Sequence, residues 1–370
     1  MPVSPTLAEN LALAVVSAYL EAERSLLARI AASVARGLDA PNWAEQQLLA
    51  VQAYRRDAQA TLAALQETTA QAATVAVETA TNRGTAAAAA ELAVALGRPV
   101  VDLLGEVPGR GAVVRLAAEL VERITSTHPR ILRVTMDAYR EVIARVTPRT
   151  LLGAETRRDT AQAALDDFAA RGITGIVDRT GRGWELASYV EMATRTATAH
   201  AAVDAHSERL MSAGMDLVQV SDAPQECKVC RPWEGKVLSL SGVTVGAVER
   251  EHATEDGRTV RVRVAGSLAA ARAAGLYHPG CRHSHSVYLP GVTKAPTGTA
   301  DPEGDAARQR LRALERRVRR AKRLEAVALD PQARRAANAR VRAAQKDIRD
   351  HVASTSAKRQ PQRERIGTAR

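Results

Sequence analysis

Apolar residues recur at helical spacing along most of this chain. Six of them near the N-terminus follow one another at intervals of three, four and seven: Leu13, Val16, Leu20, Leu27, Ile30 and Val34. This spacing predicts one buried face of a long helix that ends before Pro41. A second, alanine-rich helix is predicted from about Ala44 to Ala95, with an interruption at Asn82-Arg83-Gly84. Further helical spacing covers 112–124, the stretch after His128 and 184–213.

The period changes after Val237. The runs VTVGAVEREH and TVRVRV flank Glu255-Asp256-Gly257, and their valines alternate with charged or small residues, which predicts a half-exposed β-hairpin. The run DLVQVS predicts a strand before it, and Ser267 caps a short helix that Gly275 closes. The predicted fold class is therefore mainly α, with a smaller α+β unit.

The C-terminal part follows a linker rich in Pro, Gly and Thr. It contains two predicted helices, the second of which begins at Asp330-Pro331. The buried stripe of the first helix is expected to be Leu311, Leu314, Val318, Ala321, Leu324 and Ala328, with arginines over the rest of its surface. The last dozen residues carry no apolar pattern and are expected to be disordered.

These patterns divide the chain into four segments. Residues 1–153 form a body of long helices, 154–292 an α+β domain with a Cys/His cluster, 293–304 a linker and 305–370 a basic helical tail. A chain of 370 residues is long enough for two or three domains.

Composition and charge sharpen this description. Hydrophobic residues make up 46% of the chain but aromatic residues only 3%, so alanine, leucine and valine must build the core. No apolar run is long enough to cross a bilayer and no secretion signal is present at the N-terminus, so a soluble protein without a membrane partner is expected.

The positive charge is unevenly distributed. The segment from Pro302 to Arg370 holds 20 of the 52 Lys and Arg residues and 8 of the 41 Asp and Glu residues, so the rest of the chain has 32 basic and 33 acidic residues. The whole positive excess therefore lies in the tail, which indicates a polyanion or an acidic protein face as its partner.

All three cysteines lie in two short loops. Cys227 and Cys230 form a C-x2-C pair, while His278 and Cys281 form an H-x2-C pair about 50 residues later. This spacing is typical of a tetrahedral structural zinc site. His283 could replace His278 as the fourth ligand, and the sequence does not choose between them.

Three other interpretations of the cysteines stay open. Each could be a small buried apolar residue. Cys227 and Cys230 could form a redox pair, although Arg-Pro-Trp follows them and no clear strand-to-helix setting is present. Cys281 could be a nucleophile with a histidine base, but the sequence reveals no third group that would orient such a base.

Three stretches carry a resemblance to a known family. CKVCRPWEGKVLSLSG, GLYHPGCRHSHSVYLPG and LRALERRVRRAKRLEAVALD resemble the phage minor capsid protein 2 family, relatives of the Mu F-like head morphogenesis proteins. The similarity extends over roughly Leu186 to Arg365, and the H-P-x-C-R-H loop is its most specific part. The resemblance implies a minor structural protein of a phage virion, made in the bacterial host cytoplasm, that acts in head assembly, DNA packaging or ejection beside portal or capsid proteins, in several copies or as an oligomer.

The resemblance leaves two other functions to weigh. A cellular nucleic-acid-binding regulator with a zinc module is one alternative. A toxin-like enzyme is another, because some Mu F-like proteins carry ADP-ribosyltransferase domains. The E-x-E run Glu249-Arg250-Glu251 could suggest such a site, but an exposed strand explains it better. No enzymatic activity is therefore expected.

The tail is expected to contact double-stranded DNA through phosphates. It has no Phe, Tyr or Trp to stack on bases, so sequence-independent contact fits best. The expected contacts are Arg312, Arg316, Arg317, Arg319, Arg320, Lys322 and Arg323. A solvated helical hairpin that binds an acidic protein is the alternative for this tail.

Overall fold

The computed structural model describes residues 5–103, 110–151, 156–174, 176–177, 181, 183–223, 226–296 and 301–366. The predicted boundary between residues 153 and 154 lies outside these ranges, as do residues 297–300 of the predicted linker. The four-segment division stays a prediction.

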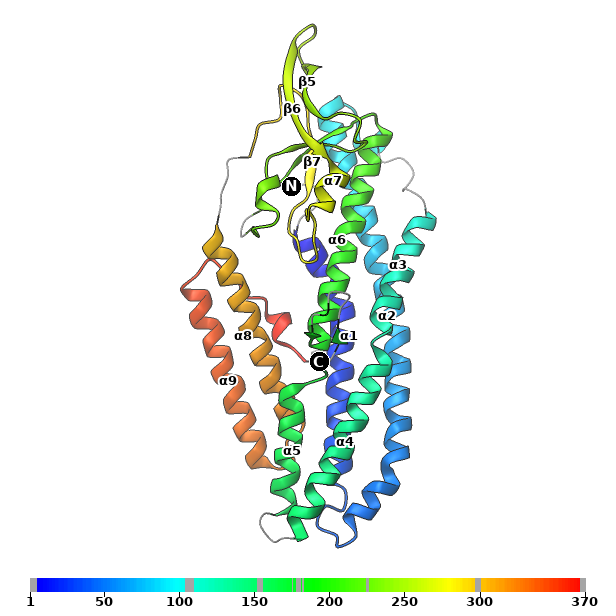
Figure 1. Ribbon diagram of the computed structural model, residues 1–370, viewed down its shortest axis with the longest axis vertical. Helices are drawn as coiled ribbons and strands as arrows, with labels where there is room; N and C mark the ends of the chain where they lie inside the picture. Colours follow the sequence, from blue (N-terminus) through cyan, green and yellow to red (C-terminus); the bar gives the residue numbers. More distant parts are fainter. Residues whose placement is uncertain are drawn as a thin grey trace. The chain divides into compact units, whose positions relative to one another are not determined.

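The described residues form a mainly helical protein with a small mixed sheet (Figure 1). The α-helices are α1 (Pro5–Ala35), α2 (Trp43–Leu96), α3 (Arg110–Thr125), α4 (His128–Leu151), α5 (Arg157–Arg171), α6 (Leu186–Ser212), α7 (Leu268–Ala273), α8 (Pro302–Ala326) and α9 (Pro331–Ala353). The strands are β1 (Ile176–Val177), β2 (Gly183–Trp184), β3 (Leu217–Val220), β4 (Val237–Ser239), β5 (Gly246–Glu251), β6 (Thr259–Ser267) and β7 (His285–Val287). Short 3-10 helices are η1 (Val100–Leu103), η2 (Arg231–Trp233) and η3 (Pro361–Glu364). Among the described residues, no helix has both the length and the apolar character needed to cross a membrane.

The chain separates into two compact units, each built from distant segments. Unit 1 comprises residues 1–12, 72–121 and 192–306, and unit 2 comprises 13–71, 122–191 and 307–370. Helices α1, α2, α3, α6 and α8 each contribute residues to both units.

Helix α2 is continuous, so the predicted interruption near Gly84 is wrong. At Gly84 a Cβ atom would lie 2.1 Å from the carbonyl oxygen of Ala202 in α6. The glycine therefore lets the α6 backbone approach α2 closely. It does not break the helix, because the rest of α2 is rich in strong helix formers.

Unit 1 is built on a five-stranded sheet in the order β5-β6-β4-β3-β7. The β4–β6 pair is parallel and the other pairs are antiparallel. Val218 and Val220 of β3 share one buried cluster with Leu210 of α6 and Ala271 of α7. Leu217 belongs to a second cluster, together with valines of β4 and β6, as the alternation along a strand requires. The predicted hairpin is confirmed as β5–β6, and Figure 1 shows it extending beyond the other strands of the sheet.

Local capping signals also hold in unit 1. The Ser267 side chain accepts a hydrogen bond from the amide of Ala270 at the start of α7, as predicted.

Unit 2 is a helical assembly with an aromatic centre. Trp43 is fully buried at the start of α2 and donates its indole N–H to the carbonyl of Val34, at 2.9 Å. Tyr54 stacks on Tyr139 of α4, with ring centroids 4.8 Å apart, and the Tyr139 hydroxyl reaches the side chain of Gln47 at 2.7 Å. These few large side chains fill gaps that alanine-rich helices leave between them.

The C-terminal helices α8 and α9 lie side by side in unit 2 (Figure 1). The Asp330 side chain caps α9 by accepting hydrogen bonds from the amides of Gln332 and Ala333, as predicted. The expected disorder of the last dozen residues is wrong for residues up to 366. Arg363 of η3 is buried and forms ion pairs with Glu191 and Glu315, which the tail sequence alone could not reveal.

Candidate metal centre and nucleic-acid interface

The first cysteine loop follows β3 and ends in η2. The amides of Cys230 and Arg231 both donate to the carbonyl oxygen of Cys227, at 3.2 and 3.1 Å. This tight turn brings the two sulfurs of the C-x2-C pair onto the same side of the loop, where a single ion could contact both.

The second loop follows α7 and also turns tightly. Tyr277, the non-glycine residue with a positive φ (61°) among the described residues, is buried, and the next turn joins the amide of Cys281 to the carbonyl of His278 at 2.9 Å. At Gly275, whose φ is 105°, a Cβ atom would lie 2.7 Å from the Val229 side chain. Glycine is therefore needed where the second loop meets the first.

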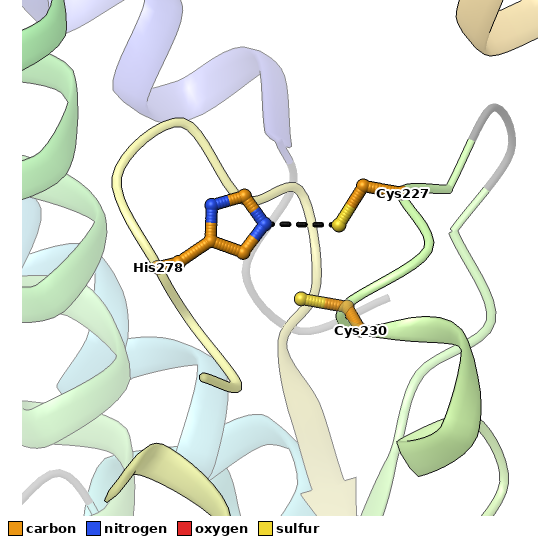
Figure 2. A group of neighbouring side chains, drawn as sticks. All are labelled: Cys227, Cys230 and His278. Atoms are coloured by element: carbon orange, nitrogen blue, oxygen red, sulfur yellow. Dashed lines mark hydrogen bonds between the residues drawn. The ribbon is translucent and has the colours of Figure 1, made fainter. Parts of the chain in front are cut away.

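Five donor residues meet where the loops touch, and we call them the cysteine cluster: Cys227, Cys230, His278, Cys281 and His283. The sulfur of Cys227 lies 2.9 Å from Nε2 of His278, as Figure 2 shows. The sulfur of Cys281 lies 3.4 Å from that of Cys230 and 3.4 Å from Nδ1 of His283. Donor atoms around tetrahedral zinc are about 3.5–3.8 Å apart, since Zn–S and Zn–N bonds are about 2.3 and 2.0 Å. The observed separations are all shorter than this range, by about 0.6 Å for Cys227 and His278 and by about 0.1–0.4 Å for the other two. The five donors form two triads that share Cys230, and the donor atoms of each triad lie within 4.8 Å of one another, close enough to bind a metal ion.

Both histidines have an outer partner that orients them. Nδ1 of His278 lies 3.0 Å from the carbonyl oxygen of Pro279, which leaves Nε2 directed at Cys227. Nε2 of His283 lies 2.6 Å from the Glu234 carboxylate, which leaves Nδ1 directed at Cys281. Such partners fix the tautomer of a metal-binding imidazole. Each histidine is thus prepared as a ligand, and Cys230 belongs to the donor triad of both.

Glu234 was not expected from the sequence. It lies in the WEG run that follows the C-x2-C pair, so its nearness to the first loop was visible, but its contact with a histidine 49 residues away was not. The Cys281–His283–Glu234 chain also supplies the third group that a thiol nucleophile would need. The second sulfur 3.4 Å away and two more donors at the same place favour a metal centre over that alternative.

The cluster favours the thiolate form of Cys281. The hydrogen bond from Cys230, helped by His283, lowers the pKa of Cys281 to about 4. The same hydrogen bond and burial raise the pKa of Cys230. Burial alone would lower the pKa of His283, but its bonds to Cys281 and Glu234 raise it above the usual value. A thiolate is the form in which cysteine binds metal.

The other histidines near these loops lie outside the cluster. His285 accepts or donates bonds within a buried group formed with Tyr277 and Ser207, at 2.8 and 3.0 Å. His252 lies in the β5–β6 hairpin beside Glu255.

A comparison with known protein families shows which family the chain belongs to. The model of the family described as phage minor capsid protein 2 matches residues 3–353, nearly the whole chain. The chain belongs to the phage minor capsid protein 2 family. Neither a curated protein nor a solved structure gives a significant match. Family membership supports a structural role in the virion and suggests that this minor capsid protein is not an enzyme.

The match also extends the likeness seen in the sequence. The N-terminal helices showed no recognisable motif, yet the family model covers them as well. The Glu249-Arg250-Glu251 run lies on β5, where Glu249 is opposite Arg261 of β6, as expected for a charged strand face.

The seven cations of α8 that were predicted to contact DNA differ in exposure in this minor capsid protein. Arg316, Arg317 and Arg320 are exposed, Arg312 and Lys322 are half-buried, and burial lowers the pKa of Lys322. The expectation that all these cations lie on the surface is wrong for two members, Arg319 and Arg323, which are only 5% and 3% exposed.

Arg319 and Arg323 belong to a group that we call the buried arginine cluster, with Glu23 of α1 and Glu185 before α6. Arg323 forms ion pairs with both carboxylates and donates Nε to the carbonyl of Ala169 at 2.9 Å. Arg319 lies 3.7 Å from Glu185. Burial raises the pKa of Glu23; burial also acts on Glu185, but the two arginines lower its pKa on balance. These arginines anchor α8 to segments far from the tail in sequence, and their burial leaves almost no surface for contact with phosphates.

Proposed function

We propose that this protein acts in phage head morphogenesis, close to the portal, as a minor structural component whose C-terminal helices contact double-stranded DNA. The family match over residues 3–353 is the observation that carries the virion role. Portal or capsid proteins would be its assembly partners, several copies would enter each virion, and assembly would take place in the host cytoplasm.

A zinc ion in the cysteine cluster is part of this proposal. Three sulfurs and two oriented imidazoles come from two loops that bracket β4, β5, β6 and α7. An ion bound there would cross-link the loops and hold the sheet of unit 1, whose aromatic content is low. A rigid module of this kind suits a component that must keep its shape inside a particle.

The DNA contact rests on charge. The tail holds the whole positive excess of the chain, and exposed arginines remain on α8 and α9 after the buried arginine cluster is set aside. Packaged DNA is the dense polyanion that such a surface would meet in a virion.

The virion role is tested by removing the gene from its phage. Particles should then be malformed or lack DNA, and mass spectrometry of wild-type particles should find the protein in few copies relative to the major shell protein. Normal particle yield and DNA content without the protein, together with its absence from purified particles, would favour the regulatory zinc protein instead.

A further inference from the structure

The inner face of α9 is set by its packing on α8. Ala344 and Ile348 lie in one apolar cluster with Leu311, Leu314 and Val318. Ala337 is buried on the same side of the helix. This fixes which side of α9 is turned away from the protein.

The opposite face carries a row of cations, which we call the α9 stripe: Arg335, Arg342, Lys346 and Arg349. All four side chains are exposed, and their spacings of seven, four and three keep them within roughly 60° of arc and along about 21 Å of helix axis. The positions between them on this face are Asn338 and Ala339. Lys346 also pairs with Asp350 at the edge of the stripe, but both groups are exposed, and such a pair is worth little.

The exposed cations of α8 are arranged differently. Arg317 forms an ion pair with Asp347 of α9, an exposed contact like that of Lys346 with Asp350. Arg310, Arg316 and Arg320 are also exposed, while Arg319 and Arg323 are buried. The exposed cations of α8 extend from residue 310 to residue 320, about 15 Å of helix axis, against about 21 Å for the α9 stripe. The longest continuous row of exposed positive charge on the two helices is therefore on α9.

The character of the α9 stripe indicates what it binds. Protein interfaces have an apolar or aromatic centre, and this face offers only Ala339 among its cations. Duplex DNA presents one negative charge for about every 1.7 Å of its axis and requires no apolar contact. A row of four cations along one helix therefore suits duplex DNA better than a protein surface.

We propose that the α9 stripe is the surface on which this protein holds the phosphates of double-stranded DNA, independently of base sequence. The proposal rests on the DNA contact in the proposed function and moves it from α8, where the sequence placed it, to the outer face of α9. Four phosphates engaged would give a salt slope of about 3.6, or roughly a 100-fold loss of affinity between 50 and 200 mM salt.

The test uses full-length protein and random-sequence duplex DNA, with binding measured by fluorescence anisotropy at two salt concentrations. The α9 variant changes Arg335, Arg342, Lys346 and Arg349 to Gln. A control variant changes four exposed cations elsewhere to Gln and so lowers the net charge equally: Arg55, Arg56, Arg130 and Arg133. A third variant carries Arg316→Gln, Arg317→Gln and Arg320→Gln. Circular dichroism checks that each variant stays folded.

The α9 variant should lose most of its salt slope, and with it most of the roughly 100-fold change in affinity between 50 and 200 mM salt. The control variant should keep a slope close to that of the wild type. Equal losses in the α9 and control variants, or a loss confined to the α8 variant, would overturn the α9 stripe but keep the DNA contact. Wild-type protein that shows no salt-dependent binding would overturn both. In that case an acidic protein becomes the partner to seek for the tail.

Discussion

The cysteine cluster and the buried arginine cluster solve the same problem in different ways. Each ties together segments that are far apart in the chain, since Cys227 and Cys281 join two loops of unit 1, while Arg323 joins α8 to Glu23 and Glu185 in unit 2. In the first, the proposed ion would come from outside the chain and would require deprotonated sulfur. The second depends on charges that the chain itself supplies, and it is costly to break because one charge would remain buried alone.

This contrast shows how a charged or metal-binding residue should be interpreted. The chain has only three cysteines, and their C-x2-C and H-x2-C spacing is enough to predict a metal site. The sequence around an arginine in the tail, which has 20 cations, does not show whether that arginine is buried, because burial depends on carboxylates elsewhere in the chain.

The largest effect should come from Cys230, which belongs to both donor triads. Cys230→Ser should abolish zinc binding and loosen the sheet of unit 1, because structural zinc contributes on the order of 10 kcal/mol to small metal-bound modules. Elemental analysis of freshly purified protein checks this. His252→Ala serves as the control and should retain about one zinc per chain; a Cys230→Ser protein that still binds a full equivalent would exclude the cysteine cluster as the metal centre.

Breaking the buried arginine cluster should have the next largest effect. Arg323→Met should reduce the stability of unit 2 by about 3–5 kcal/mol, since Glu23 would be left buried without its ion pair. Arg320→Met, one turn away on the exposed side, should change stability by no more than about 0.5 kcal/mol. Hydrogen exchange of α5 and α8 measures both, and equal exchange in the two variants would mean that the buried pair does not stabilise this unit.

A change at Glu234 tests whether His278 or His283 is the fourth ligand. If His283 binds the ion, Glu234→Gln should weaken zinc affinity by about 10- to 100-fold, because the carboxylate orients the imidazole. Competition with a chromophoric chelator gives the affinity. An unchanged value would assign the position to His278, and His278→Ala should then cause the loss that His283→Ala does not.

A smaller effect concerns the pH dependence of the buried arginine cluster. The arginines lower the pKa of Glu185 below its ordinary 4.5, so this carboxyl stabilises unit 2 above its unfolded pKa, and the stabilisation is lost as the pH falls through the folded value. Glu185→Gln should cost about 1–3 kcal/mol at neutral pH. Its difference from wild type should shrink below about pH 4 when α8 exchange is compared across pH. A difference that grows on acidification would reverse the assigned direction.

Local signals predicted much of the fold. The caps at Ser267 and Asp330 and the β5–β6 hairpin each depend on residues within a few positions of one another, and all three are confirmed. The five donors of the cysteine cluster were also named from spacing within two loops.

Features that depend on distant partners could not be predicted. Gly84 looked like a helix breaker because the approach of Ala202 in α6 is invisible in α2. Arg319 and Arg323 looked like surface cations because their carboxylates lie outside the tail. Arg363 looked disordered because its partners, Glu191 and Glu315, are far from it in the sequence. Glu234 gained its role only when the fold brought it to His283.

Hydrogen exchange with and without a zinc chelator is the sharpest test of this contrast, because it follows both clusters in one sample. Removal of zinc should strongly increase exchange in β3, β4, β6 and α7, while α4, α5 and α8 exchange as before. Unchanged protection across the sheet after complete metal loss, or equal loosening of the helices around Arg323, would show that the ion does not hold unit 1 in the way proposed.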